Sequence, residues 1–267
     1  MASARPADLF TQTGDFLVDW IDTAGRSCIL FARAVREFPR CFGKFGEIVR
    51  QVFICGVISL PVVTITAFFS GAVISAQVGS EMGRRLGNTD FLGSIVGAAV
   101  VREMGPVFAA VVVAGLVGGS MASVLGTMKV SEEIDALEVM GIDPVRYLVM
   151  PRLIAMIIAV PVLTVYADAV GIVGGGVVAK YQIKSSFHMF FQNAANLLEV
   201  KDIIFGLVKA LVFGIIVTIV ACDQGLSTTG GAEGVGKATM RSVVYSFLLV
   251  LVANYLLLSL VYVPFLM

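Results

Sequence analysis

The sequence predicts an all-α, polytopic integral membrane protein with five transmembrane helices and an N-terminal interfacial amphipathic helix. Two compositional observations predict this class: 58% of the 267 residues are hydrophobic and only 14% are charged. Soluble domains average about 45–50% apolar and about 25% charged residues, and a soluble fold of this length could not bury so much apolar surface. The 19 basic and 19 acidic residues balance, so the charge gives no indication of nucleic-acid binding.

A third observation is the distribution of charge along the chain. Stretches 52–80, 104–128 and 242–267 are uncharged, while Asp168 and Lys209 are the single charges of 153–179 and 203–222. About 20 apolar residues in a helix cross the hydrocarbon core. The uncharged run 91–101 is too short to cross alone, so we attach it to the following stretch. The predicted spans are 52–80, 91–128, 153–179, 203–222 and 242–264.

Lysine and arginine predict the orientation, because cytoplasmic segments are enriched in them. With the N-terminus inside, the cytoplasmic segments hold twelve basic residues and the outer segments five. This distribution favours a cytoplasmic N-terminus. The opening residues do not have the pattern of a secretory signal peptide.

The first of two predicted regions, residues 1–50, contains an amphipathic helix. Its apolar side chains recur at steps of three and four residues, with aspartates and arginines between them. Such a helix lies in the membrane plane with its apolar face in the lipid; packing against another domain remains the alternative. The apolar positions are Leu17, Trp20, Ile21, Ala24, Cys28, Phe31, Val35 and Phe38.

Residues 51–267 form the second region, and small residues four apart recur within its spans, as in Gly93/Gly97 and Gly171/Gly175. Such spacing lets helix backbones approach closely in a membrane. A further ladder comprises Ala114, Gly118, Ala122 and Gly126. These positions predict a compact bundle.

The cytoplasmic segment 129–152 contains a predicted short amphipathic helix, residues 131–141. Ser131 can cap its start, and Gly141 can end it. The helix has a narrow apolar stripe, and acidic side chains cover the rest of its surface. This pattern is typical of a helix that docks into a groove of a partner protein; a solvated connector on the membrane surface is the alternative. The stripe comprises Ile134, Leu137 and Met140, and the acids are Glu132, Glu133, Asp135 and Glu138.

Two patterns resemble catalytic motifs but do not qualify. Residues 231–237 fit G-x-x-x-x-G-K, yet Ala238 stands where a phosphate loop needs Ser or Thr, and a span precedes it instead of a strand. His188 is the only histidine, and no convergent ligands accompany it, which argues against metal-dependent catalysis. We therefore predict no catalytic residue, metal or cofactor in this chain.

Charged residues inside spans are costly and usually face a cavity or a partner. Arg102 and Glu103, followed by Gly105-Pro106, are the strongest candidates, either as an ion pair that offers charge to a ligand or as a pair that pins two helices together. Asp168 is expected to be an internal hydrogen-bond partner. Lys209 is expected to extend its ammonium toward the outer membrane surface.

Three runs resemble signatures of the MlaE/YrbE permease family, the membrane subunits of bacterial lipid-transporting ABC systems. They are Arg102–Pro106, the long run Glu133–Tyr147 leading into Pro151-Arg152, and Gly230–Thr239. The resemblance extends from about residue 50 to the last span. It implies that the phosphate-loop-like run is a cytoplasmic loop of a permease.

The family resemblance also implies partners and sites. It implies a homodimer around a cavity for phospholipid, a cytoplasmic ATPase dimer that holds ATP and Mg²⁺, a periplasmic MCE-domain protein and, in many systems, a STAS-domain protein. Arg102 and Glu103 would lie near the lipid cavity, and Ile74, Gln77 and Val78 would line it. Residues Glu132 to Gly141 would be the coupling helix on the ATPase.

The chain departs from the family pattern at three places. Leu116 and Val124 stand where the family usually has Arg and Glu, and Asn254 stands where it has Asp. We interpret this as an internal ionic network replaced by apolar packing and a neutral amide, which need not destabilise the fold.

Two other functions remain as alternatives at this stage. An ion-coupled secondary transporter of an amphipathic small molecule would use Asp168 and Arg102-Glu103, although no inverted repeat is evident. A membrane-embedded lipid enzyme would need a convergent set of catalytic groups, and none is found.

Overall fold

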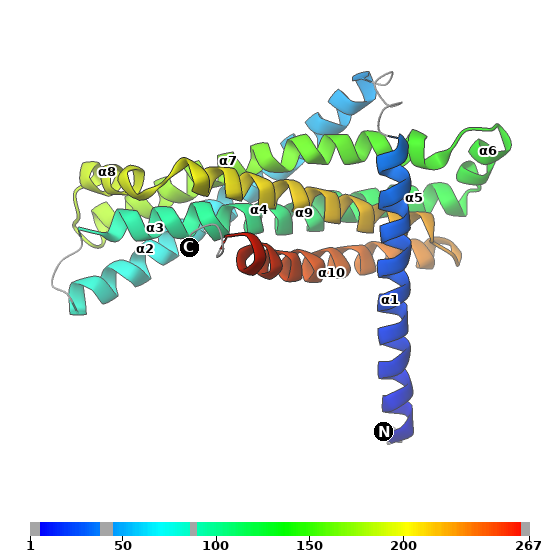
Figure 1. Ribbon diagram of the computed structural model, residues 1–267, viewed down its shortest axis with the longest axis horizontal. Coiled ribbons are helices and arrows are strands. Elements are labelled where there is room, and N and C mark those ends of the chain that lie inside the picture. The colour runs from blue at the N-terminus through cyan, green and yellow to red at the C-terminus, as the bar shows by residue number, and fades with distance from the viewer. Residues whose placement is uncertain (1–5, 38–44, 86–89, 263–267) are drawn as a thin grey trace.

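The computed structural model describes residues 6–37, 45–85 and 90–262, and every regular element in these ranges is helical (Figure 1). Five helices are long and apolar enough to cross a membrane, which confirms the predicted number. They are Gly46–Arg85, Leu92–Val130, Val145–Tyr181, Val200–Leu226 and Gly231–Leu260. Each includes nearly all of its predicted span and extends it, at one end or both, by helical turns that carry charged or small residues.

The elements follow one another along the chain with short connections. The N-terminal helices are α1 (Pro6–Glu37) and α2 (Phe45–Arg85). The second span comprises α3 (Leu92–Ala99), η2 (Val100–Met104), α4 (Gly105–Val113), η3 (Ala114–Gly118) and α5 (Gly119–Val130). Next come α6 (Glu133–Val139), η4 (Val145–Val149), α7 (Met150–Tyr181) and α8 (Phe187–Leu197). The chain closes with α9 (Val200–Leu226), α10 (Gly231–Leu257) and η5 (Leu258–Tyr262).

The second span runs through Arg102 and Glu103 without a break, as predicted. It accommodates the Gly105-Pro106 step through the π-helical segment η2, which directly precedes the proline helix α4. A π-helical turn inserts one extra residue into a helix and occurs often at functional sites. Here it determines the directions in which Arg102 and Glu103 leave the helix.

Glycines bring the spans into backbone contact. A Cβ on Gly71 of α2 would overlap the backbone oxygen of Gly171 in α7, and one on Gly174 would overlap the oxygen of Phe68. On α3, Gly93 and Gly97 lie against Phe190 and Ala194 of α8. The small-residue spacing therefore correctly predicted close helix packing.

Helices α8 and α9 follow α3 to α5 in the same direction. Positions 93 and 97 contact 190 and 194, and farther along, Gly118 lies against Val217 while Gly225 contacts Leu125. The first span's helix α2 crosses this assembly obliquely (Figure 1). This pairing brings the N-terminal turns of α9 alongside η2.

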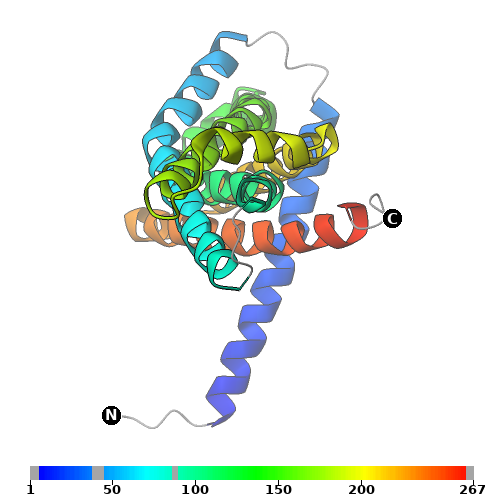
Figure 2. The same cartoon turned by 90° about the vertical axis from the view of Figure 1, so that its left-hand side faces the viewer.

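Helix α1 stands nearly at right angles to α7, α9 and α10 in both views (Figures 1 and 2). Of its described side chains, Thr23, Ser27, Leu30 and Ala34 are buried against the bundle. Phe31 and Val35, from the predicted apolar face, are exposed and point away from it. The position of this helix relative to the membrane stays a prediction. Leu17, Trp20 and Ile21 lie among residues whose side chains are not described, and Phe38 lies outside the described residues.

Helix α1 is fixed to the bundle by an ion pair. Arg26 contacts the buried carboxylate of Asp223 in α9, with 3.6 Å between Nε and Oδ1. Arg26 is half exposed. Its contact joins α1 to the last turns of α9, at the same end of the bundle as α6 (Figure 1).

Candidate functional site

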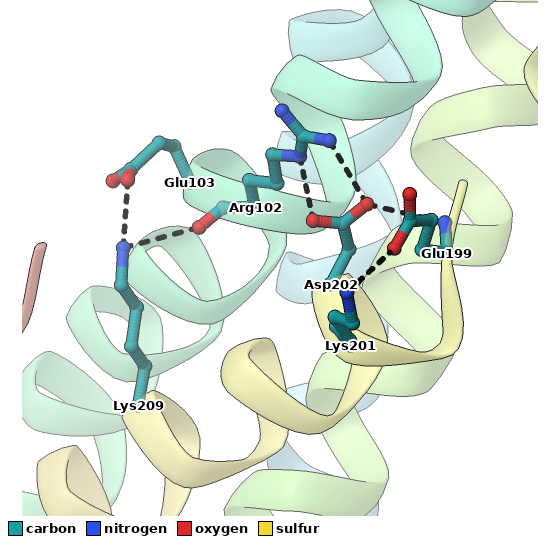
Figure 3. A network of polar contacts seen from close by, with 6 residues as sticks. All are labelled: Arg102, Glu103, Glu199, Lys201, Asp202 and Lys209. Atoms are coloured by element: carbon teal, nitrogen blue, oxygen red, sulfur yellow. Dashed lines mark hydrogen bonds and ion pairs between the residues drawn. The ribbon is translucent and has the colours of Figure 1, made fainter. Parts of the chain in front are cut away.

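Arg102 and Glu103 do not pair with each other, so the predicted ion pair between them is wrong. Adjacent residues on a helix point in directions about 100° apart and do not face one another. Each side chain instead reaches a different residue of α9 (Figure 3). The alternative in which the charges pin helices together describes this geometry better.

Arg102 makes a two-point contact with Asp202, in the first turn of α9. Its Nε lies 2.8 Å from Oδ1, and its Nη2 donates a hydrogen bond of 3.0 Å to Oδ2. Asp202 is 3% exposed at its side chain, and it also accepts a hydrogen bond from the backbone N–H of Glu199. The carboxylate therefore caps α9 and neutralises Arg102 at the same time.

Glu103 holds Lys209, two turns farther along α9. The Lys209 ammonium lies 2.7 Å from Glu103 Oε1 and also donates to the backbone oxygen of Arg102 at 3.1 Å (Figure 3). The second oxygen of Glu103 accepts a 2.9 Å hydrogen bond from the Asn254 amide of α10. Three separate helical spans thus meet at one carboxylate.

The expectation that Lys209 reaches the outer membrane surface is wrong, because its side chain is 0% exposed. It lies nine residues after the first residue of α9, about 13.5 Å along the helix at 1.5 Å per residue, and its ammonium is held by Glu103. Glu103 and Arg102 are exposed by 36% and 32%. The site therefore has a buried cationic interior and an open side where Arg102 and Glu103 reach the surface of the bundle.

Asp168 of α7 lies beside this site but is not hydrogen-bonded as expected. Its Oδ1 packs against the Cα of Gly105, where a Cβ would overlap it. That oxygen is buried and has no hydrogen-bond partner among the residues the structure describes. Gly105 thus provides the space for the Asp168 carboxylate, which takes no part in the ion pairs of Arg102, Glu103 and Lys209.

The residues expected to line a lipid cavity have different surroundings. Ile74 and Val78 of α2 pack against a buried cluster that contains Val100, two residues before Arg102. Gln77 is exposed. Their role in a cavity remains a prediction.

The predicted coupling helix is shorter than expected, running from Glu133 to Val139. Ser131 does not cap it, because its hydroxyl donates back to the Thr127 oxygen in the last turn of α5 and contacts the Glu133 carboxylate, not a backbone N–H of α6. Glu132 makes the turn with a φ of 61°.

The apolar stripe of this segment is divided between two environments. Ile134 is 3% exposed and, with the partly buried Leu137, packs against the bundle's own core, whereas Met140 is 64% exposed. The acidic side chains Glu132, Glu133, Asp135 and Glu138 face solvent, and Lys129 pairs with Asp135 at 2.6 Å. The surface open to a partner is therefore mainly acidic.

The positions that depart from the family pattern do not form one group. Leu116 and Val124 line a cavity whose lining residues do not include Asn254, and Asn254 bonds to Glu103 instead. The idea of a single replaced network joining all three positions is therefore wrong. The run 231–237 also differs from expectation, because it is the helical start of α10 after a glycine turn and not a loop.

Asp202 is the functional candidate that sequence reasoning missed. A signal was available, since Asp202 and Lys209 are seven residues apart and so lie on one face of a helix. The negative Asp202 and the positive Lys209 are opposite in sign to Arg102 and Glu103, with which they pair. Asp202 lies directly before the predicted span 203–222, so it is not among the charges predicted inside spans.

Comparison with known proteins agrees with these features. The family model described as "Permease MlaE" matches residues 48–260. The chain belongs to the MlaE permease family. It is 42% identical over 252 residues to a "Probable ABC transporter permease protein" of Rickettsia felis, covering 90% of this chain and 97% of that protein.

Two further MlaE relatives come from photosynthetic organisms. A protein of Synechocystis with the same description is 39% identical, covering 78% of each chain. The chloroplast protein TRIGALACTOSYLDIACYLGLYCEROL 1 of Arabidopsis thaliana is 37% identical, covering 75% of this chain and 57% of that one. The chain is thus a multi-pass permease subunit of an ABC transporter, not itself catalytic, and it works with an ATPase subunit.

Proposed function

We propose that this permease moves phospholipid between the bacterial inner membrane and an MCE-protein conduit toward the outer membrane, driven by ATP hydrolysis on its ATPase partner. The observation that carries the proposal is the charged site of Arg102, Glu103 and Lys209 within the spans. A phospholipid headgroup that crosses apolar surroundings needs polar groups along its path. The relative named for a diacylglycerol glycolipid supports a lipid cargo.

The functional unit in this proposal is a homodimer with a cytoplasmic ATPase dimer, a periplasmic MCE-domain protein and, in some systems, a STAS-domain protein. The N-terminus is cytoplasmic, so α6 faces the ATPase. Its exposed acids Glu133 and Glu138 would contact basic side chains of the ATPase, which supplies ATP and Mg²⁺.

Co-purification tests this arrangement. We expect the tagged chain to bring down its ATPase in a fixed ratio, and the Glu133→Lys/Glu138→Lys double variant to release the ATPase while the chain itself stays folded. The matched control is Glu81→Lys, which reverses an exposed acid at the other end of the bundle. Undiminished ATPase recovery with the double variant would refute the docking role of α6.

Transport is tested with the complete complex in vesicles. ATP addition should move a fluorescent phospholipid out of the permease-containing bilayer, and Glu103→Gln should slow this movement severalfold without releasing the ATPase. A complex that hydrolyses ATP but moves no phospholipid would overturn the lipid assignment.

A further inference from the structure

An amphipathic groove lies at the α6 end of the bundle, away from the Arg102 site. It is a cavity of about 470 Å³ between α2, the η3–α5 segment and the start of α7. A second cavity of about 270 Å³ shares Arg50, Gln51 and Arg152 with it and opens toward η4. Glu47 also lines this second cavity, and its carboxylate accepts a 2.9 Å hydrogen bond from Gln51. The combined volume is in the range of small-molecule sites.

One wall of the groove is apolar and follows two helices toward the middle of the spans. Ile54 and Ile58 are exposed residues of α2, one helical turn apart, on this wall. Opposite them, Val124 and Leu116 are 47% and 38% exposed. Leu116 and Val124 are eight positions apart in the helix, which gives the wall a length of about 12 Å.

The other end of the groove carries Arg152, which forms no ion pair with any residue that the structure describes. Arg152 is partly buried, seven residues into the helix Val145–Tyr181 and directly before the predicted span 153–179, and it donates a hydrogen bond from Nη1 to the Leu148 oxygen at 2.6 Å. Arg50 beside it is 69% exposed and has only a loose 3.8 Å contact with Glu47.

An uncompensated charge in a half-buried position is costly, and it is tolerated where a ligand or partner supplies the opposite charge. A phosphodiester suits this need, because a guanidinium offers several donors to phosphate oxygens. Basic pockets between transmembrane helices at the cytoplasmic surface commonly hold lipid headgroups. The adjoining apolar wall lies where the acyl chain of such a lipid would run.

We infer that this groove holds a glycerophospholipid of the inner leaflet, with its phosphate on Arg152 and Arg50 and an acyl chain between α2 and α5. This inference rests on the proposed lipid transport and adds a second, cytoplasmic-side lipid site to it. The lipid replaces the missing counter-ion of Arg152 and keeps water out of the groove.

Native mass spectrometry of the purified complex, depleted of lipid, tests the inference. The probes are dioleoyl phosphatidylglycerol, dioleoylglycerol with the same chains but no phosphate, and inorganic phosphate. We expect Arg152→Gln to weaken phosphatidylglycerol binding about tenfold or more, because a charge-assisted contact is lost. The matched control, Lys180→Gln, removes a cation at the other end of α7 and should bind the lipid as the unaltered chain does.

A second variant guards against misfolding. Val124→Glu places a carboxylate in the groove and should supply the missing counter-ion, so lipid binding should fall while the thermal midpoint without lipid stays level or rises. Equal binding by Arg152→Gln and the unaltered chain would overturn the inference. So would equal binding of dioleoylglycerol, or equal stabilisation by inorganic phosphate alone.

A second copy of the chain is the competing occupant. Disulfide crosslinking between copies through Ile58→Cys, in a Cys28→Ser/Cys41→Ser background, would place a second copy of the chain in the groove and overturn the lipid assignment. Loss of transport with intact Arg152-dependent binding would instead refute the proposed function and leave the groove site standing.

Discussion

Neutralising Glu103 should damage the protein more than removing Lys209, although the two form one ion pair. At 2.7 Å, their attraction is about 6 kcal/mol with an effective dielectric constant of about 20, and desolvation of the ammonium offsets part of it. Glu103→Gln leaves a fully buried ammonium without its counter-ion, which costs about 3–5 kcal/mol. Lys209→Met leaves Glu103 one-third exposed and still bonded to Asn254, so its cost should be about 1–2 kcal/mol.

The measurement is the unfolding free energy from SDS titration in detergent micelles. The double variant Glu103→Gln/Lys209→Met should be more stable than Glu103→Gln alone, because no buried charge remains. Lys201→Met, which removes an exposed lysine from the same helix, is the control and should change stability by less than about 1 kcal/mol. A double variant less stable than Glu103→Gln would refute this account of the site.

Three further predictions concern packing and the second ion pair. Gly71→Ala should destabilise the bundle by about 2 kcal/mol or more in the same titration, because the new methyl overlaps the α7 backbone. The control Gly56→Ala has open space around it on α2 and should be neutral or slightly stabilising. Equal losses of stability in the two variants would contradict the contact. Asp202→Asn should cost about 2–3 kcal/mol through loss of the Arg102 contact, and a loss no larger than that of the exposed-lysine control would contradict it. Ile134→Ala should lower the free energy of unfolding by about 2 kcal/mol, because Ile134 is buried, and should weaken ATPase recovery in co-purification. Unchanged recovery would show that ATPase docking does not depend on the packing of α6.

The spans could be predicted because their signal is local. Charge-free stretches of bilayer length specify a transmembrane helix without reference to the rest of the chain. The long second helix was predictable for the same reason, since 91–101 has no other role. Small residues four apart likewise marked the faces at which backbones meet.

The charged site was only half predictable, because its partners are about 100 residues apart in the sequence. Arg102 and Glu103 were recognised by their position inside a span, but a sequence does not say which helix lies opposite. The pairing with Asp202 and Lys209 follows from the parallel packing of α8–α9 on α3–α5, and the π-helical turn directs the two side chains. Similarly, Ser131 is a good capping residue by type, but the φ of Glu132 places the start of α6 beyond it.

Helix α9 is a stiff rod held by ionic contacts near both ends. Asp202 fastens one end to the second span, and Asp223 fastens the other to the perpendicular helix α1, about 32 Å away for 21 residues at 1.5 Å each. Such a rod cannot tilt at one end without straining the contact at the other. A displacement of α1 would therefore shift Asp202 and change its contact with Arg102.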